Sequence, residues 1–149
     1  MDFWSEIAEG AAAESSVWAA ALLPGDARER VATWSLLVPH HLGLGLETVY
    51  EAYLVHYGRP RLFETPDADE GVLLGDYLYA HGLVRIAEAG GVPAVAALAE
   101  LIARCAAERA DGRVDDGAAW VEAARALGGS ADDDTVAHAL ARHSARVAS

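Results

Sequence analysis

Residues 71–89 constrain the fold more than any other part of this chain. They predict a helix with apolar residues on nearly every side, namely Val72, Leu73, Leu74, Tyr77, Leu78, Leu83, Val84 and Ile86. Such a helix is usually buried among several neighbours or spans a membrane. A span needs about 20 predominantly apolar residues, whereas this stretch contains Asp76, His81, Arg85 and Glu88. We therefore expect a helix packed among other helices, with part of its surface available to a second subunit.

Apolar residues at helical spacing predict six further helices, separated by proline and glycine. The seven expected helices cover residues 2–22, 26–38, 46–57, 71–89, 93–110, 120–127 and 131–146. Asp26 and Glu29 have the spacing of a capping box at the start of the second helix. No strand-like alternation of useful length occurs. The pattern predicts one all-α domain, a helical bundle over residues 1–149.

The charge of the chain limits its partners. Its 149 residues include 23 acidic and 11 basic ones, a net charge of −12. An acidic surface repels phosphate backbones and anionic lipids, so we expect no nucleic-acid partner and no membrane partner. Asp2 and Glu6 precede every basic residue, which is the wrong charge for a secretory signal and favours a cytoplasmic location. Cys105 is the only cysteine and is expected to be a core thiol.

Two polar clusters have alternative interpretations. The carboxylates of Asp67, Asp69 and Glu70 are of the type that binds magnesium, but acidic residues also favour helix N-termini, and we prefer that interpretation. Arg59 and Arg61 flank a proline and would clamp an anion as a pair. Loop arginines are more often solvated or paired with nearby acids, which we again prefer. The histidines have no recognised zinc spacing, so no metal ligand is assigned.

Two segments resemble motifs of the trans-polyprenyl diphosphate synthase family, whose members have the isoprenoid synthase fold. In the first segment, 47–56, the residues that fit the helix before the family's first aspartate-rich motif are Glu47, Ala52, Leu54, Val55 and His56. The second segment, Leu74-Gly75-Asp76-Tyr77-Leu78-Tyr79-Ala80, is similar to the family's L-x-G-D-Y-L-L-A helix. The resemblance implies the N-terminal half of that fold.

The aspartates of the family's first motif are missing here. In a gapless alignment their three positions are occupied by Tyr57, Gly58 and Arg61, which cannot hold the magnesium ions that neutralise a leaving diphosphate. The resemblance therefore implies no catalytic residue in this chain and no cofactor of its own, with magnesium only where a catalytic partner supplies the site.

The implied role is that of a small, non-catalytic subunit of a heteromeric polyprenyl diphosphate synthase, acting in isoprenoid or quinone side-chain biosynthesis. Its partner would be the catalytic subunit or a second copy of itself. By the same resemblance, Ala52 and Tyr53 would line the elongation tunnel, although a tyrosine at such a position is more often plain core. The subunit interface would include Leu74, Tyr77, Leu78, Leu98 and Ile102.

Two other functions stay open. The first alternative is a stand-alone homodimeric binding or scaffold protein without prenyl chemistry. The second is a divergent magnesium-dependent prenyltransferase that uses Asp67, Asp69 and Glu70 as substitute ligands.

Overall fold

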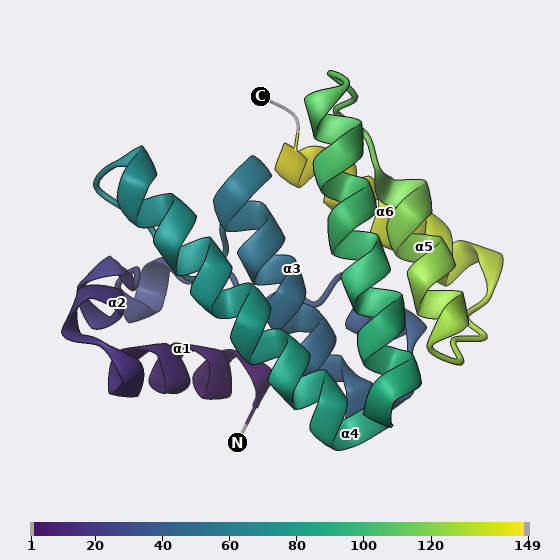
Figure 1. The fold of residues 1–149 in the computed structure, drawn as a ribbon, viewed down its shortest axis with the longest axis horizontal. Coiled ribbons are helices and arrows are strands. Elements are labelled where there is room, and N and C mark those ends of the chain that lie inside the picture. The colour runs from purple at the N-terminus through teal and green to yellow at the C-terminus, as the bar shows by residue number, and fades with distance from the viewer. Residues whose placement is uncertain (1, 148–149) are drawn as a thin grey trace.

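The computed structural model describes residues 2–147, which form six α-helices and no β-strand. The predicted all-α class is therefore confirmed. The helices are α1 (Phe3–Glu14), α2 (Ser16–Ala21), α3 (Gly43–Tyr57), α4 (Ala68–Ala110), α5 (Gly117–Ala126) and α6 (Asp133–Val147) (Figure 1). Short 3-10 turns occupy Gly25–Ala27, Ser35–Leu37 and His40–Leu42 between α2 and α3.

Helix α4 folds back on itself at Gly91, as the glycine pair and proline in the sequence predict (Figure 1). Gly91 has φ 72° and ψ −166°, a conformation that is essentially restricted to glycine. Pro93 follows in the first turn of the next segment, where its missing N–H removes no helical hydrogen bond. We call residues 68–90 the first arm of α4 and residues 92–110 its second arm.

Helix α3 is the centre of the fold and crosses the first arm at close range. A Cβ atom on Gly82 of the arm would lie 2.7 Å from Cγ2 of Val49 and 3.0 Å from its backbone nitrogen. A Cβ atom on Gly45 of α3 would lie 2.7 Å from Cγ1 of Ile86. Glycine at both positions lets the two backbones approach, and residues 45–54 of α3 are all buried.

Two apolar clusters pack against α3. The larger one joins α3 to the second arm, α5 and α6, and contains Trp34 stacked on Trp120 with ring centroids 5.8 Å apart. Cys105 lies in it and is buried, as predicted for a core thiol. The smaller cluster joins α1 and α2 to the first arm and includes Leu62 and Phe63.

The prediction of a helix over residues 26–38 is wrong. That segment is irregular apart from two 3-10 turns, because its backbone is bound by side chains from elsewhere. The N–H groups of Thr33 and Ser35 donate to Oε2 of Glu47, at 2.9 and 3.0 Å. The expected helix over 2–22 is also divided, since Ser15 is extended and its Oγ caps α2 by accepting from the Val17 N–H.

Candidate functional site

A buried ion triad joins α3 to the loop that follows it. Glu47 and Glu51 lie one turn apart on α3, and Arg61 inserts between their carboxylates. Arg61 Nη1 lies 2.7 Å from Oε1 of Glu47, and Arg61 Nε lies 2.9 Å from Oε1 of Glu51. All three side chains are fully buried. Two carboxylates around one guanidinium leave a net negative charge inside the protein, which needs further compensation.

Backbone N–H groups supply that compensation. Glu51 accepts from the N–H groups of Arg61 and Leu62, each at 2.9 Å to Oε2, in addition to the two N–H groups that Glu47 accepts. The Arg61 guanidinium also donates to the carbonyls of Val31 and Glu47. Burial alone would lower the pKa of Arg61, but the two carboxylates outweigh burial and raise that pKa. The triad is hydrogen-bonded throughout, so it holds the loop in place.

Arg59 and Arg61 do not form an anion clamp in this structure. Arg61 is directed into the core, whereas Arg59 is exposed. Arg59 is held by its backbone, since its N–H donates to the carbonyl of Arg146 at 3.0 Å. The preferred interpretation of two solvated loop arginines therefore fails for Arg61, because its charge partners are the carboxylates of α3 rather than Glu64 or Asp67.

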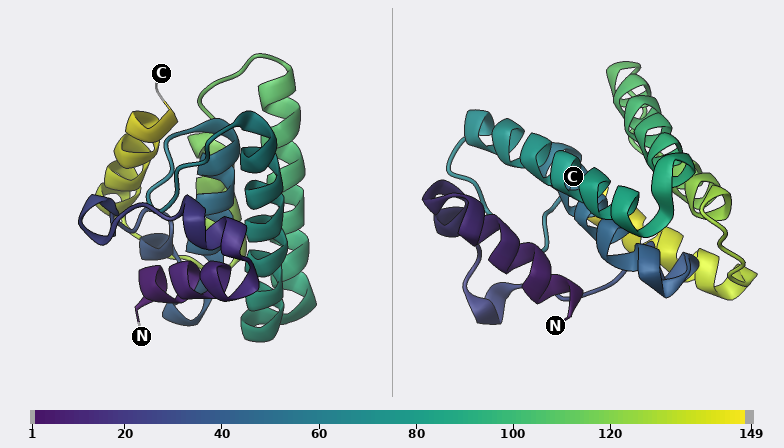
Figure 2. Two further views of the ribbon diagram at one scale, coloured as in Figure 1. Left: turned by 90° about the vertical axis from the view of Figure 1, so that its left-hand side faces the viewer. Right: turned by 60° about the horizontal axis from the view of Figure 1, so that its bottom comes forward.

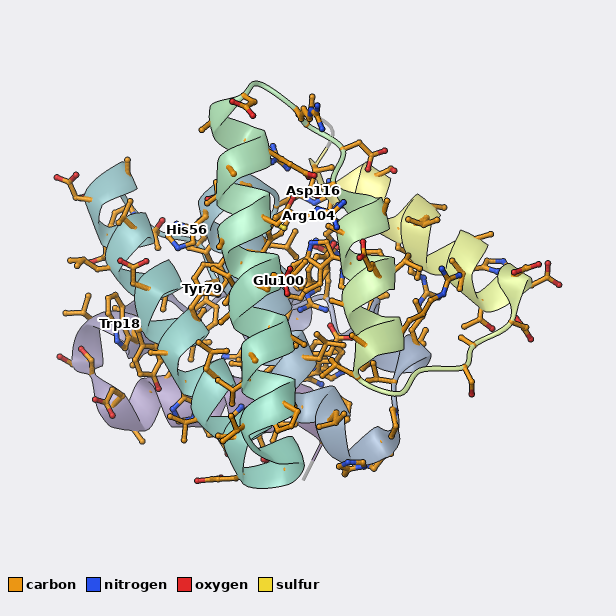
Figure 3. The ribbon with its side chains drawn as sticks, turned by 45° about the vertical axis from the view of Figure 1, so that its right-hand side comes forward. Trp18, His56, Tyr79, Glu100, Arg104 and Asp116 are labelled. Carbon is orange, nitrogen blue, oxygen red and sulfur yellow. The ribbon has the colours of Figure 1, made fainter. Side chains whose placement is uncertain are left out.

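A second buried polar network converges on Asp116. Asp116 is the residue before α5 and is labelled in Figure 3. The Tyr53 hydroxyl from α3 donates to the carboxylate at 2.7 Å, and Nε2 of His143 from α6 lies 2.8 Å from its Oδ1. Arg109, near the end of α4, donates from Nη2 to the Tyr53 hydroxyl at 2.7 Å. Tyr50 completes the network through its hydroxyl, 2.9 Å from Nδ1 of His143. One carboxylate thus connects α3, α4, α5 and α6.

The electrostatics of this network favour an ionised Asp116. Burial raises the pKa of the Asp116 carboxyl, but hydrogen bonds from His143 and Tyr53 and the charge of Arg109 outweigh it, so the pKa is lowered. Burial raises the pKa of the Tyr53 hydroxyl, which therefore remains a donor. The carboxyl of Asp116 and the imidazole of His143 are fully buried. An Asp–His–Tyr chain can relay protons in an open site, but here the carboxylate and the imidazole are enclosed and paired, a geometry that suits a structural clamp.

The acidic cluster at the start of α4 does not converge on a point. Asp67 is the N-cap of the helix, and its Oδ1 accepts from the N–H of Glu70 at 2.8 Å. Among residues 2–147, no group of three or more histidine, cysteine, aspartate or glutamate side chains is placed to hold a metal ion. The arrangement fits the preferred interpretation, in which Asp67, Asp69 and Glu70 stabilise a helix N-terminus.

Two predicted tunnel residues lie in the core. Ala52 and Tyr53 are fully buried, and Tyr53 is tied to Asp116 and Arg109. Neither residue lines the open hollows of 660 Å³ beside α2 and 430 Å³ around Arg59. Their role in binding a hydrocarbon chain stays a prediction.

The predicted interface residues mostly face inward. Leu74, Leu78 and Leu98 are covered by the chain itself, with exposed fractions of 0, 1 and 0%. Tyr77 is partly covered by Trp18, whose ring stacks on it at 6.0 Å, and Ile102 is half-buried. An interface on α4 must therefore use the opposite side of the helix from the three leucines.

That opposite side is an extended apolar surface. Of the 43 residues of α4, 21 are exposed, and only Asp69, Asp76, Glu88, Glu100 and Arg104 among them are charged. The other 16 are alanine, valine, leucine, glycine or proline. Both arms lie on the same side of the molecule (Figure 2, left). We call the 21 exposed residues of α4 the outer face of α4. The most exposed large side chains on it are Val72, Leu73, Val84 and Val92, at 52 to 80%.

By length and composition alone, α4 is apolar enough to cross a membrane. Its fold-back makes this weak evidence. Every 18-residue stretch of α4 with no more than two charged residues includes Gly91, where the helix breaks. No straight apolar segment of the required length, about 20 residues, is therefore present in α4.

Comparisons with family models, with characterised proteins and with solved structures found no match. Function is therefore inferred from the residues and their geometry.

The sequence did not indicate the Asp116 network, because its members are far apart along the chain. Asp116 precedes the helix expected over residues 120–127, and His143, 27 residues later, has no recognisable metal spacing. The ion triad had a usable signal. Glu47 and Glu51 are one turn apart on a helix that is otherwise apolar, and buried carboxylates require a cationic partner.

Proposed function

We propose that this chain is a non-catalytic helical protein that acts by associating with another polypeptide. The observation that carries the proposal is the outer face of α4, whose 16 uncharged exposed residues include no polar side chain. An exposed helix surface that is mostly apolar is typical of protein–protein interfaces. The fold-back of α4 at Gly91 favours a protein partner over a lipid bilayer.

The buried ionisable groups support a role without chemistry. Arg61 and its two glutamates are occupied by one another and by backbone groups, and Asp116 is occupied by Tyr53 and His143. A catalytic acid or base must be within hydrogen-bond reach of a substrate. Groups that are enclosed and paired in this way stabilise the scaffold on which the outer face is built.

A narrower form of the proposal is a small subunit of a polyprenyl diphosphate synthase. It is supported by the contact between the two motif segments that carry the resemblance. His56 of the first segment lies 3.3 Å from Asp76 of the second, through Nε2 and Oδ1. A Cβ atom on Gly75 would collide with the His56 ring. Three of the matching residues, His56, Gly75 and Asp76, thus meet between α3 and α4.

Two measurements on the full chain test the proposal. The purified chain, supplied with Mg²⁺ and with allylic and isopentenyl diphosphates, is expected to show no product. Co-expression with a full-length polyprenyl synthase from the same genome tests the narrower form, which predicts a stable complex and a changed product length. Turnover by the chain alone that is abolished by Asp67→Ala would overturn the non-catalytic proposal, with Glu64→Ala as the control outside the acidic cluster.

A further inference from the structure

We infer that the hollow around Arg59 binds a small zwitterion with an apolar side chain, of the class of the free α-amino acids. The hollow has a volume of 430 Å³ and lies between the C-terminal end of α3, the segment 23–29 and the loop 58–65. None of its lining residues belongs to α4, so the inference goes beyond the proposed function and does not rest on it. Three features carry it: a fixed frame, two charged groups with unused hydrogen-bonding capacity, and an apolar wall.

Backbone hydrogen bonds fix the frame of the hollow. The N–H of Glu29 donates to the carbonyl of Arg61 at 2.9 Å. Arg59 is held from both sides, since its N–H donates to the carbonyl of Arg146 at 3.0 Å and its own carbonyl accepts from Arg146 Nη1 at 3.1 Å. The buried ion triad anchors the same loop through Arg61. A site whose backbone is already ordered loses little conformational entropy when a ligand binds.

This frame presents an unpaired cation. Acidic residues outnumber basic ones by 23 to 11 in the chain, so an arginine has many potential partners. The Arg59 side chain is nevertheless exposed, and no ion pair or hydrogen bond of its guanidinium is present within residues 2–147. A guanidinium has a planar fork of N–H donors that matches the two oxygens of a carboxylate. Arg59 is therefore the group expected to bind the carboxylate of the ligand.

Glu29 presents a carboxylate with one oxygen in use. Its Oε2 accepts from Arg146 Nη1 at 3.0 Å, and no partner of its Oε1 is present among the described residues. The hydrogen bond from Arg146, together with the charges of Arg146 and Arg59, lowers the pKa of Glu29, so the carboxylate is ionised at neutral pH. The second oxygen can accept from the ammonium group of a ligand.

The charges around the hollow favour a ligand that carries both signs. Glu29 and Glu64 contribute two carboxylates, and Arg59 and Arg146 contribute two guanidinium groups. A simple anion would meet the carboxylates as like charges, and a simple cation would meet the guanidinium groups. A zwitterion has a complementary group for each sign. Because it has no net charge, the −12 charge of the chain does not repel it.

Apolar side chains supply the rest of the wall. Leu23, Val55 and Pro60 line the hollow and are only partly buried, so each has surface left to cover a ligand. Small-molecule sites are mostly apolar, with a few polar groups that orient the ligand. The wall therefore suits a branched aliphatic or an aromatic side chain beside the charged groups.

The direct test is a titration of the isotope-labelled full chain with L-leucine and with L-phenylalanine, followed by the NMR chemical shifts of the backbone amides. Titration to about 10 mM detects a dissociation constant of about 1 mM or tighter. At least one of the two amino acids is expected to bind, with the largest shifts at Gly58, Arg59 and Thr65. Glycine should bind at least about 10-fold more weakly, because it has no side chain to bury. The inference is overturned by the absence of saturable shifts with both amino acids, or by shifts confined to other parts of the chain.

Blocked derivatives of the amino acid that binds test the requirement for both charges. The N-acetyl derivative lacks the ammonium group and the amide derivative lacks the carboxylate, and each should bind at least about 10-fold more weakly than the free amino acid. These derivatives also represent the C-terminus and the N-terminus of a peptide. Equal or tighter binding of either one would overturn the inference in favour of a peptide chain end.

Two variants test the assigned groups. Arg59→Met, and Glu29→Gln, which keeps an acceptor for Arg146, should each weaken binding by about 10-fold or more. Arg113→Met is the matched control, because Arg113 is also an exposed arginine without an ion pair within residues 2–147 and does not line the hollow. Circular dichroism confirms that each variant is folded. Binding that survives Arg59→Met would overturn the inference, whereas a chain that binds the amino acid but no other polypeptide would overturn only the proposed function.

Discussion

The Tyr53 hydroxyl lies 2.7 Å from both carboxylate oxygens of Asp116, and this contact joins the middle of α3 to the start of α5. Because Asp116 also binds His143, the same carboxylate places α6 against α3. Tyr53, Asp116 and His143 are of residue types common in active sites, but here they fix the helices relative to one another. The outer face of α4 depends on that scaffold, since its second arm is attached to the network through Arg109.

Removing the Tyr53 hydroxyl should destabilise the protein without opening a large cavity. Tyr53→Phe deletes one donor to Asp116 and the acceptor of the Arg109 guanidinium, so we expect a loss of about 1–3 kcal/mol in the free energy of unfolding. Tyr57→Phe is the control, because no hydrogen bond of the Tyr57 hydroxyl is present within residues 2–147. Urea denaturation followed by tryptophan fluorescence measures both. Equal stabilities for the two variants would mean that the Tyr53 contact is not a clamp.

The two arginines around Pro60 should differ sharply in their effect on stability. Arg61→Met leaves two buried carboxylates without a cation, and we expect a loss of about 3–5 kcal/mol or failure to fold. Arg59→Met alters an exposed side chain and should change stability by less than about 0.5 kcal/mol. Thermal unfolding by circular dichroism compares the two. Similar effects at both positions would contradict the assignment of Arg61 to the core.

Asp116 should make stability depend on acid pH. Its pKa in the folded protein is lowered from the ordinary 3.8, so its stabilising contribution is complete above about pH 5 and is lost as the pH falls through the lowered pKa. Asp116→Asn cannot titrate there, and its loss of stability between about pH 5 and pH 2 should be smaller than that of the wild-type protein. Urea midpoints across this range provide the measurement. Parallel curves for both proteins would show that Asp116 has no lowered pKa.

The crossing of α3 and the first arm should not tolerate a side chain at Gly82. A Cβ atom there lies 2.7 Å from the Val49 side chain and 3.0 Å from its backbone nitrogen, so the helices must move apart. We expect Gly82→Ala to destabilise by about 1–3 kcal/mol, despite the better helix propensity of alanine. Gly25→Ala, with no atom within 4 Å of the added Cβ, is the control and should be close to neutral. Chemical denaturation of both variants decides whether the contact is that close.

The sequence pattern predicted the helices correctly where glycine, proline and apolar periodicity determine the backbone conformation. The glycine pair at residues 90–91 and Pro93 marked the fold-back of α4, and the periodicity marked α3 and both arms. The helix predicted over residues 26–38 is absent because its backbone N–H groups donate to Glu47 and its Val31 carbonyl accepts from Arg61, and these partners become available only when distant segments meet. Local propensity cannot register such contacts.

The apolar character of residues 71–89 predicted both a buried side and an exposed one, but not which residues lie on each. Leu74 and Leu78 face the core because Gly75 and Gly82, on the same side of the helix, allow α3 to approach. Leu73 and Val84 consequently face outward, at 61 and 53% exposure. The predicted helix is correct, and its orientation follows from the two glycines rather than from hydrophobicity.

The central claim is that the outer face of α4 is covered by protein in solution. Hydroxyl-radical labelling of the full chain, with mass-spectrometric readout of Leu73, Val84 and Val92, tests it most directly. These side chains should label several-fold less in the complex with the co-expressed polyprenyl synthase, or at about 100 μM than at about 1 μM where the partner is a second copy, while Leu36, an exposed leucine outside α4, labels equally in every sample. Equal labelling of all four side chains in every sample would contradict the claim.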